Sequence, residues 1–284
     1  MVLAAGVEFD AYRLVRQLGA GGNGEVWLAY HLQTNDEVAI KLLLPHIRND
    51  QERVERFENE LLKASGVIHP HIVPVIAFGE WDGRRYIISR YIAGGTLRQR
   101  LETGHPLPVT QGLRYLSQMA HALDHIDREL GSIHRDVKPE NILLSADGGD
   151  CYLTDFGLAL NPLIDPRLTR PGSKPPGSGR YMAPEQWMGG ELSHQTDIYA
   201  LGIMAYELLT GQRPFHESEN GPDYLIAIAH IETPIARHPR LTVEQWRIIA
   251  QAAAKNPDDR FTTAQAFVDT LRATCLPDTD ENRR

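Results

Sequence analysis

Hydrophobic residues follow two different periods along this chain, and the period changes partway along it. From Tyr12 to about Ile92, short apolar runs rich in valine, isoleucine and tyrosine alternate with turn residues, a pattern typical of β-strands. The clearest strands are expected at Val26–Tyr30, Val38–Leu44, Ile72–Phe78 and Tyr86–Ile92. Trp81-Asp82-Gly83 is predicted to form the hairpin turn between the last two. The first part of the chain is therefore predicted to be rich in β-structure.

One helix is expected among these strands, and longer helices after them. Asn49-Asp50-Gln51-Glu52 fits a capping box, and it precedes apolar residues at helical spacing, namely Val54, Phe57, Leu61 and Ala64. From Thr96 onward helical patterns dominate. One apolar stripe comprises Leu113, Leu116, Ala120, Leu123, Ile126 and Leu130. Ile198–Leu209 is apolar nearly all round, which predicts a helix buried at the centre of a lobe. We expect an α+β fold with a small β-rich lobe followed by a larger helical lobe.

Composition and charge narrow the class of protein. The chain has 284 residues, 42% hydrophobic content and a formal net charge of −8, which gives no basic footprint for nucleic acid. No apolar run approaches the ~18 residues needed to cross a bilayer, and the first ten residues do not resemble a signal peptide. Cys151 and Cys275 fit neither a disulfide framework nor a zinc site. We expect a cytoplasmic protein with no membrane segment within this chain and no nucleic-acid partner.

A glycine-rich segment precedes the first clear strand. It consists of Gly19, Ala20, Gly21, Gly22, Asn23, Gly24, Glu25 and Val26, and it fits the pattern G-x-G-x-x-G-x-V. Glycines let a backbone approach phosphate groups closely, and exposed amides can bind their oxygens. Alone the pattern is weak, because a dinucleotide-binding loop or a simple glycine turn would look similar. A dinucleotide-binding loop opens a helix, whereas Val26–Tyr30 resembles a strand, so we predict a hairpin and exclude a dehydrogenase.

Two charged residues occur in otherwise apolar patterns. Lys41 ends the strand-like Val38-Ala39-Ile40-Lys41, either as a functional cation or as an edge-strand lysine whose amine reaches water. Glu60 follows 19 residues later, at the border of the apolar face of the expected helix. There it can point inward and pair with Lys41, or it can remain a solvated glutamate.

The segment from Ile133 to Asn141 concentrates residue types that carry chemistry, and Asp155-Phe156-Gly157 and Ala183-Pro184-Glu185 follow it. Asp136 can accept a proton from a hydroxyl group. Asn141 and Asp155 offer hard oxygen ligands of the kind Mg²⁺ prefers. Lys138 offers a positive charge to a transferring phosphoryl group. Any one of these could arise by chance, but the whole series in this order is specific.

Taken together, these motifs resemble a Hanks-type (eukaryotic-like) protein kinase of the bacterial serine/threonine branch, over Tyr12 to Leu271. The resemblance implies a bilobal protein-kinase fold. Its catalytic domain would span residues 12–272, with an N-lobe over about 12–92 and a C-lobe over about 93–272. Residues 1–11 would be an N-terminal extension and residues 273–284 a polar tail. ATP and Mg²⁺ are the implied cofactors, with Mn²⁺ as an alternative metal.

The resemblance also implies roles for particular residues. Asp136 would be the catalytic base with Lys138 beside it, Lys41 would orient the phosphates and pair with Glu60, and Asn141 and Asp155 would bind the metal. The glycine segment Gly19–Val26 would cover the phosphates. The adenine would lie against Val26, Ala39, the gatekeeper Ser89, the hinge residues Arg90, Tyr91 and Ile92, and Leu143. Asp197 and Arg260 match structural positions, with Arg260 paired to Glu185.

Two details of the resemblance concern the substrate and the regulation. Lys138, two residues after Asp136, and the segment Gly177–Glu185 are similar to those of serine/threonine kinases rather than tyrosine kinases. Transfer of the ATP γ-phosphate to serine and threonine hydroxyls of proteins is therefore implied. Arg135 directly before Asp136 goes with activation-loop phosphorylation in this family, so we expect autophosphorylation at Thr169 or Ser173.

Some positions depart from the family pattern, and two other functions stay open. Arg90 stands where many relatives have an acidic residue, and Leu160 replaces a common basic residue. Gly94, Gly95 and Thr96 occupy the stretch where an acidic ribose contact is usual. A pseudokinase scaffold would have the same fold but usually lacks a catalytic residue. A small-molecule phosphotransferase would share the lobes but lacks the Ala-Pro-Glu segment and the long activation loop.

Overall fold

The computed structural model describes residues 3–21, 24–42, 65–102, 107–155, 179–220 and 223–275. The chain divides into two compact units, and the division falls between Ala93 and Gly94. Asp155 is the exception, because it belongs to the first unit although its neighbour Thr154 belongs to the second. The expected helix at residues 49–64, which contains Glu60, lies outside the described residues.

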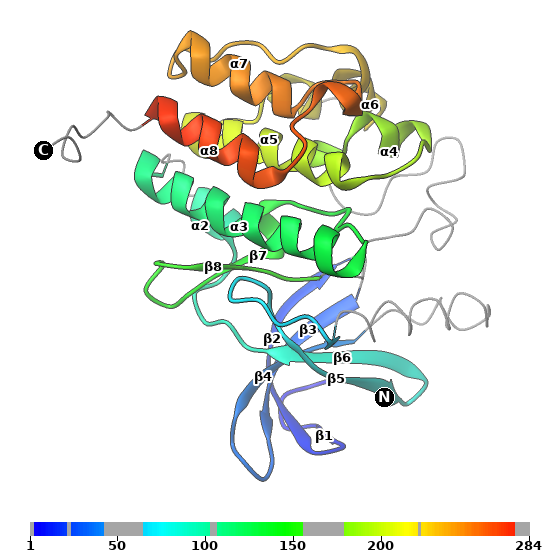
Figure 1. Ribbon diagram of the computed structural model, residues 1–284. Helices are drawn as coiled ribbons and strands as arrows, with labels where there is room; N and C mark the ends of the chain where they lie inside the picture. Colours follow the sequence, from blue (N-terminus) through cyan, green and yellow to red (C-terminus); the bar gives the residue numbers. More distant parts are fainter. Residues whose placement is uncertain are drawn as a thin grey trace, which may run out of the picture. The chain divides into compact units, whose positions relative to one another are not determined.

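The first unit is built on a six-stranded antiparallel sheet with the order β1-β2-β3-β4-β6-β5 (Figure 1). Its strands are β1 (Glu8–Phe9), β2 (Tyr12–Gly21), β3 (Gly24–His31), β4 (Glu37–Leu42), β5 (Val75–Trp81) and β6 (Arg84–Arg90). The predicted turn between β5 and β6 is confirmed. Asp82 and Gly83 have φ angles of 49° and 67°, and a two-residue turn with positive φ at both positions matches the twist of a hairpin.

One strand begins later than the pattern predicts. Ile72 was expected to open the strand that ends near Phe78, but β5 starts only at Val75. Pro74 stands directly before β5, and a proline has no N–H group to give to a sheet ladder. The apolar residues Ile72 and Val73 are nevertheless buried. They therefore contribute to the core from an irregular segment.

Glu8 and Phe9, which were expected to belong to an N-terminal extension, form the first strand of the sheet. Phe9 of β1 is only 3% exposed, and its ring lies 4.9 Å from that of Trp81 and 5.3 Å from that of Tyr86. The Tyr86 hydroxyl donates a hydrogen bond to Asp10 at 2.6 Å. β1 thus covers one end of a core cluster that comprises Phe9, Leu14, Trp27, Ala29, Val38, Ile40, Leu42 and Ile88.

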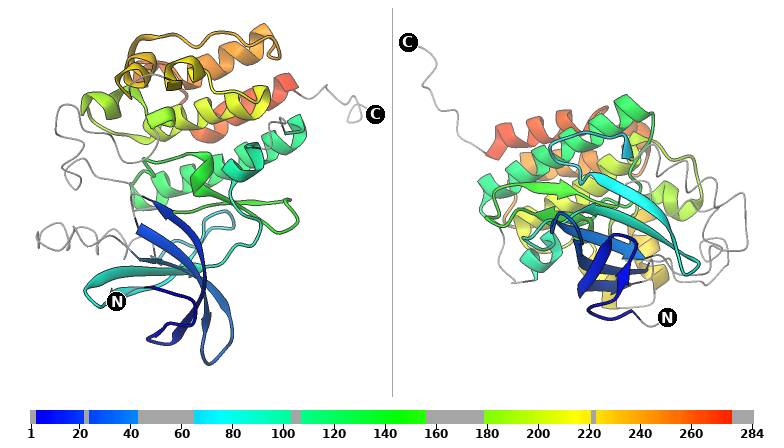
Figure 2. Two further views of the ribbon diagram at one scale, coloured as in Figure 1. Left: turned by 180° about the vertical axis from the view of Figure 1, so that it is seen from behind. Right: turned by 90° about the horizontal axis from the view of Figure 1, so that it is seen from below.

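The second unit is mainly helical, and Figure 2 shows its helices from two further sides. The helices are α2 (Leu97–Leu101), α3 (Val109–Leu130), α4 (Pro184–Met188), α5 (His194–Thr210), α6 (Asp223–Glu232), α7 (Val243–Ala252) and α8 (Ala264–Cys275). Short 3-10 turns are η2 (Pro139–Asn141), η3 (Gly179–Tyr181), η4 (His216–Asn220) and η5 (Pro257–Asp259). A two-stranded sheet joins β7 (Ile142–Leu144) to β8 (Cys151–Leu153).

The longest helices confirm the predicted pattern. In α3 the stripe residues from Leu113 to Ile126 are buried, and only Leu130 at its end is partly exposed. The helix stops at Gly131, whose φ of 54° is the left-handed conformation that favours glycine at a helix C-terminus. α5 is buried along almost its whole length and packs against α3, α7 and α8. Within the described residues, no helix has both the length and the apolar character to cross a membrane.

Candidate active site

The glycine segment forms a hairpin between two strands, as predicted. Gly19 pairs with Val26, Ala20 with Glu25, and Gly21 with Gly24 across β2 and β3. Gly24 has a φ of 131°, which side chains rarely permit. A Cβ atom on Gly19 would meet no protein atom within 4 Å, so packing inside the protein does not require a glycine there. Gly22 and Asn23 lie outside the described residues.

Lys41 lies on an interior strand, which rules out the edge-strand alternative. β4 is hydrogen-bonded between β3 and β6, with Lys41 opposite Val26 on one side and Ile87 on the other. The Lys41 side chain is 11% exposed, and its Nζ lies 2.7 Å from Oδ2 of Asp155. Asp155 has a φ of 64°, unusual for a residue with a side chain. The ion pair therefore lies within the first unit. The expected pair with Glu60 lies outside the described residues.

Four of the predicted nucleotide-contacting residues share one face of this sheet. Val38, Ile40 and Leu42 of β4 point into the core, so Ala39 and Lys41 point to the opposite face. Val26 lies opposite Lys41, and Ser89 lies opposite Ala39, and directly opposed residues of antiparallel strands lie on the same face. Val26, Ala39, Lys41 and Ser89 therefore form one surface away from the core.

The predicted hinge residues follow β6. The amide of Arg90 donates to the carbonyl of Pro74 at 3.2 Å, so that amide is used within the protein. Tyr91 accepts a hydrogen bond from Arg16 through its hydroxyl at 3.2 Å. Ile92 is buried at the end of the first unit.

The segment after the hinge has a structural role that explains its departure from the family pattern. A Cβ atom on Gly94 would lie 2.2 Å from the carbonyl oxygen of Ser145, so only glycine fits there. Thr96 caps α2, because its hydroxyl accepts from the Gln99 amide at 3.2 Å and the Gln99 side chain accepts from the Thr96 amide at 2.9 Å. Thr96 also forms a β-bridge with Leu143 of β7.

Three residues of the segment from Ile133 to Asn141, here called the catalytic loop, come together in the second unit. Oδ2 of Asp136 accepts from Nζ of Lys138 at 2.7 Å and from Nδ2 of Asn141 at 2.8 Å. The same Asn141 amide also donates to the Asp136 carbonyl at 2.8 Å. The Asp136 side chain is 32% exposed, and the hydrogen bonds described for its carboxylate all fall on Oδ2. Oδ1 is therefore the oxygen placed to receive a proton.

A buried carboxylate anchors the backbone just before Asp136. Asp197 of α5 is 1% exposed and accepts from the amides of His134 at 2.7 Å and Arg135 at 2.8 Å. Arg135 has a φ of 69°, a conformation that a residue with a side chain keeps only when its surroundings impose it. Burial raises the pKa of Asp197, an effect that the two amide donors and nearby histidines oppose.

Glu185 and Arg260 form the predicted ion pair. Two parallel hydrogen bonds of 2.7 and 2.8 Å join the guanidinium to the carboxylate, and the Thr196 hydroxyl donates to the same carboxylate at 2.8 Å. The Arg260 side chain is fully buried. Burial alone would raise the pKa of Glu185, but the hydrogen bonds and charge of Arg260 outweigh it and lower that pKa.

A second charged network lies beside the catalytic loop and was not predicted from the sequence. Arg98 of α2 donates to Glu140 at 2.9 Å and to Glu207 of α5 at 2.8 Å, and it also bonds the Tyr181 hydroxyl. Arg213 donates to the same Glu207 at 3.1 Å. Arg98 is 42 residues from Glu140 and 109 residues from Glu207, so no local spacing could have indicated its place in the network.

Comparison with known proteins agrees with this arrangement. Residues 12–271 match the model of the protein kinase domain family. The chain is 37% identical over 256 residues to the serine/threonine-protein kinase PrkC of Bacillus subtilis, covering 89% of this chain and 39% of PrkC. It is 38% identical over 262 residues to the serine/threonine-protein kinase PknE of Mycobacterium tuberculosis, covering 91% of this chain and 45% of PknE.

A solved structure agrees as well. The PknI kinase domain of Mycobacterium tuberculosis superposes with a TM-score of 0.73 at 31% sequence identity, covering 95% of this chain and 99% of that one. The fold is thus the bilobal α+β fold of protein kinases, and the chain belongs to the protein kinase domain family. Within that family it is similar to the bacterial serine/threonine branch. The chain spans less than half the length of PrkC or PknE.

Proposed function

We propose that this protein transfers the γ-phosphate of ATP to serine and threonine hydroxyls of proteins. The observation that carries the proposal is the contact of Asp136 with Lys138 and Asn141, which loads one carboxylate oxygen and leaves the other for a substrate hydroxyl. The serine/threonine-protein kinase names of PrkC and PknE support the substrate class.

Asp136 acts as the catalytic base in this proposal. Its Oδ1 accepts the hydroxyl proton as the oxygen attacks the phosphoryl group, while Lys138 and Asn141 hold the carboxylate in place. Phosphoryl transfer depends mainly on positioning and on stabilising negative charge. Lys138 contributes such a charge, and the anchor at Asp197 keeps the loop in its unusual backbone conformation.

ATP is proposed to bind on the face that carries Val26, Ala39, Lys41 and Ser89. Lys41 orients the phosphates, and Asp155 supplies a counter-charge to it. Glu60, which lies outside the described residues, is proposed as a second partner of Lys41. The glycine hairpin Gly19–Val26 covers the phosphates, and the open space beside Gly19 supports a close approach of a ligand. The hinge Arg90–Ile92 and Leu143 of β7 complete the adenine contacts in this proposal.

The residues proposed to hold a divalent cation suit Mg²⁺. Nδ2 of Asn141 is committed to Asp136, so the oxygen of the same amide remains for a metal. Asp155 bonds Lys41 through Oδ2 and has a second carboxylate oxygen. Mg²⁺ usually takes one or two such protein ligands and completes its shell with phosphates and water; Mn²⁺ takes the same ligands. The metal would neutralise charge developing on the phosphates.

The transfer activity can be tested directly. The purified chain should transfer labelled phosphate from ATP to a generic basic protein in the presence of Mg²⁺, and the products should be phosphoserine and phosphothreonine. Removal of Mg²⁺ with a chelator should stop the transfer. Nucleotide binding without transfer would contradict the proposal and support a scaffold function. Transfer to small molecules alone would support a small-molecule phosphotransferase.

Regulation by autophosphorylation at Thr169 or Ser173 is part of the proposal, and both residues lie outside the described residues. Arg135, next to Asp136, favours an incoming phosphate, which brings about −2 charge and three acceptor oxygens. Because Leu160 removes one basic partner, we expect a modest gain in activity. Mass spectrometry after incubation with ATP and Mg²⁺ should find the phosphate. A Thr169→Ala/Ser173→Ala double variant with full activity would contradict the regulatory role.

We also propose a cytoplasmic location for this domain, where ATP and reduced cysteines are maintained. Cys151 and Cys275 are both free thiols, and burial raises the pKa of each. Such thiols are unreactive, as expected in a reducing compartment.

A further inference from the structure

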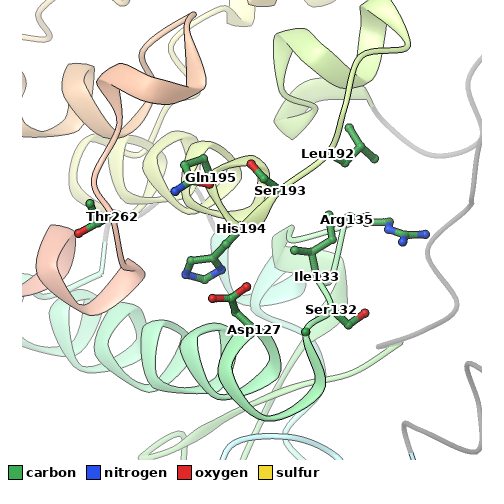
Figure 3. Close-up of a pocket in the computed structure, with 10 residues that line it drawn as sticks. Asp127, Ser132, Ile133, Arg135, Leu192, Ser193, His194, Gln195 and Thr262 are labelled. Atoms are coloured by element: carbon green, nitrogen blue, oxygen red, sulfur yellow. The ribbon is translucent and has the colours of Figure 1, made fainter.

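A polar cavity of about 380 Å³ lies within the second unit, behind the backbone of the catalytic loop (Figure 3). It is bounded by the end of α3, the loop that follows it, the start of α5 and the segment before α8. Its lining residues include Asp127, Ser132, Arg135, Ser193, His194 and Thr262. The volume falls at the small end of the range of ligand sites, so a small polar molecule would fit.

His194 is the buried polar group of this cavity. Its side chain is 7% exposed, and its Nε2 lies 2.8 Å from Oδ1 of Asp124. Its Nδ1 is buried and has no hydrogen-bond partner within the described part of the chain. A buried polar atom without a partner is costly, which points to a ligand or a water molecule at that atom. Figure 3 shows the His194 ring and the Asp127 carboxylate extending toward each other from α5 and α3.

The charges around the His194 ring favour its protonated form. Burial would lower the pKa of His194, but the hydrogen bond to Asp124 and the charges of Asp197, Asp124 and Asp127 outweigh it and raise that pKa. A protonated imidazole donates from both nitrogens. Because Nε2 already donates to Asp124, Nδ1 is the remaining donor. A group bound at Nδ1 is therefore a hydrogen-bond acceptor.

The first backbone amides of α5 are further hydrogen-bond donors beside this cavity. The helix runs for 17 residues from His194, and the first amides of a helix have no partner within it. The amide of Thr196 turns back to the Ser193 carbonyl at 2.9 Å. No bond from the amides of His194 and Gln195 is seen among the residues that the structure describes, and both amides lie at the positive end of the helix dipole, where anions bind favourably.

The negative charges around the cavity do not cancel this preference. The Asp127 carboxylate faces the His194 ring (Figure 3), but Asp127 is exposed, so solvent screens its charge. Asp124 is already bonded to His194 and to the amides of Ala264 and Gln265. Asp197 is bonded to two backbone amides. Arg135 lines the cavity with the part of the residue near its backbone, and its guanidinium points away from the His194 ring in Figure 3.

We propose that this cavity binds a small oxyanion, with a sulfate, phosphate or carboxylate group held by Nδ1 of His194 and the first amides of α5. The site is separate from the residues proposed for phosphoryl transfer and does not depend on that function. Because Ile133 and Arg135 line it, a bound anion would rest against the catalytic loop. Ile133 and Leu192 give it an apolar wall that an organic anion could contact.

Nuclear magnetic resonance of the histidine side chains tests the proposal on the full chain. Sulfate is titrated at about pH 6.5, with chloride at matched ionic strength as the control. We expect a saturable shift of the His194 ring resonances with sulfate only. Sulfate keeps its charge near neutral pH, so its affinity should fall as pH rises through the pKa of His194. The other ionisable groups around the ring are Asp124, Asp127, Asp197 and Arg135.

Two variants that nearly keep the shape of the side chain should change the sulfate affinity in opposite directions, which makes the test specific. Gln195→Glu places a negative charge at the helix start, which favours the helix but should weaken sulfate binding at least about tenfold. Asp127→Asn removes the negative charge that faces the His194 ring and should tighten binding about threefold. His194→Gln should abolish sulfate binding. If His194→Gln fails to fold, Gln195→Glu still tests the proposal.

Phenyl phosphate is the second probe, and it distinguishes an inorganic ion from an organic one. Tighter binding of phenyl phosphate than of sulfate supports a small organic phosphate as the ligand, and binding of sulfate alone supports an inorganic ion. The proposal is overturned if neither probe produces a saturable shift of His194. It is also overturned if Gln195→Glu leaves the affinity unchanged.

Discussion

Two carboxylates near the catalytic loop illustrate how differently the same group can be used. Asp197 is 1% exposed, and each of its oxygens accepts a backbone amide. Asp136 is 32% exposed, and its described hydrogen bonds fall on one oxygen. A fully satisfied buried carboxylate can only hold structure in place, whereas a half-satisfied exposed one can still accept a proton. Burial and hydrogen bonding therefore distinguish two regions. The anchoring region includes Asp197 and the pair of Glu185 with Arg260, and the reactive region includes Asp136 and Lys138.

Arg260 and Lys138 differ in burial and hydrogen bonding in the same way as the two carboxylates. Arg260 is fully buried and uses its guanidinium on Glu185 and on backbone carbonyls of Ala254, Lys255 and Gln195. Lys138, by contrast, meets Asp136 through a single hydrogen bond. We therefore expect changes in the anchoring region to alter stability first. Changes in the reactive region should alter transfer and leave stability nearly unchanged.

The largest effect on stability should come from Glu185→Ala. This change leaves the buried Arg260 without its counter-charge, at a cost of roughly 3–5 kcal/mol. The melting temperature should fall by about 10 °C or more, measured by thermal unfolding. Glu129→Ala is the control, because Glu129 forms an exposed pair with Arg128 and such pairs contribute little to stability. Equal melting temperatures for both variants would contradict the contrast.

A smaller effect is expected at Ser89, on the proposed nucleotide face. Ser89 is small and lies opposite Ala39, so a bulky ATP-competitive inhibitor should reach past it. Ser89→Met should weaken such an inhibitor at least tenfold, about 1.4 kcal/mol, with little change in stability. Inhibition constants for the two forms measure this. If both forms bind the inhibitor equally well, Ser89 is not the gatekeeper.

The smallest effect concerns the pH dependence of stability. His194 has a pKa raised above its ordinary 6.5 in the folded state, so its contribution is fully present below pH 6.5 and is lost as pH rises through the folded value. The contribution of His230 to stability changes in the opposite direction. Burial lowers the pKa of His230 to about 3, so its contribution is lost as pH falls toward that value. Thermal unfolding against pH should show a decline above 6.5 that His194→Gln removes. An identical decline in the variant would exclude His194 as its origin.

Local patterns predicted the parts of the fold and site that depend on neighbouring residues. The hairpin at Gly19–Val26, the buried helix α5 and the turn at Asp82-Gly83 follow from short-range rules of strand alternation, helical period and positive φ. The pair of Glu185 with Arg260 is separated by 75 residues, and only the family resemblance indicated it.

Other features could not be predicted because tertiary packing creates them. β1 has two residues, too few to show a period. The bonds of Arg98 to Glu207 and of His194 to Asp124 join helices that are distant in sequence. Asp155 was expected with the helical lobe, but it belongs to the first unit, where it forms an ion pair with Lys41. Sequence spacing carries no information on such contacts.

The separation between reactive and anchoring carboxylates is tested most directly by Asp136→Asn, with phosphate transfer and melting temperature measured on the same preparation. Asparagine keeps the shape of the side chain but cannot act as the base. Transfer should fall by about 10²–10⁴-fold, while the melting temperature and ATP affinity stay close to those of the unaltered protein. Undiminished transfer, or a large loss of stability in this variant, would contradict the account.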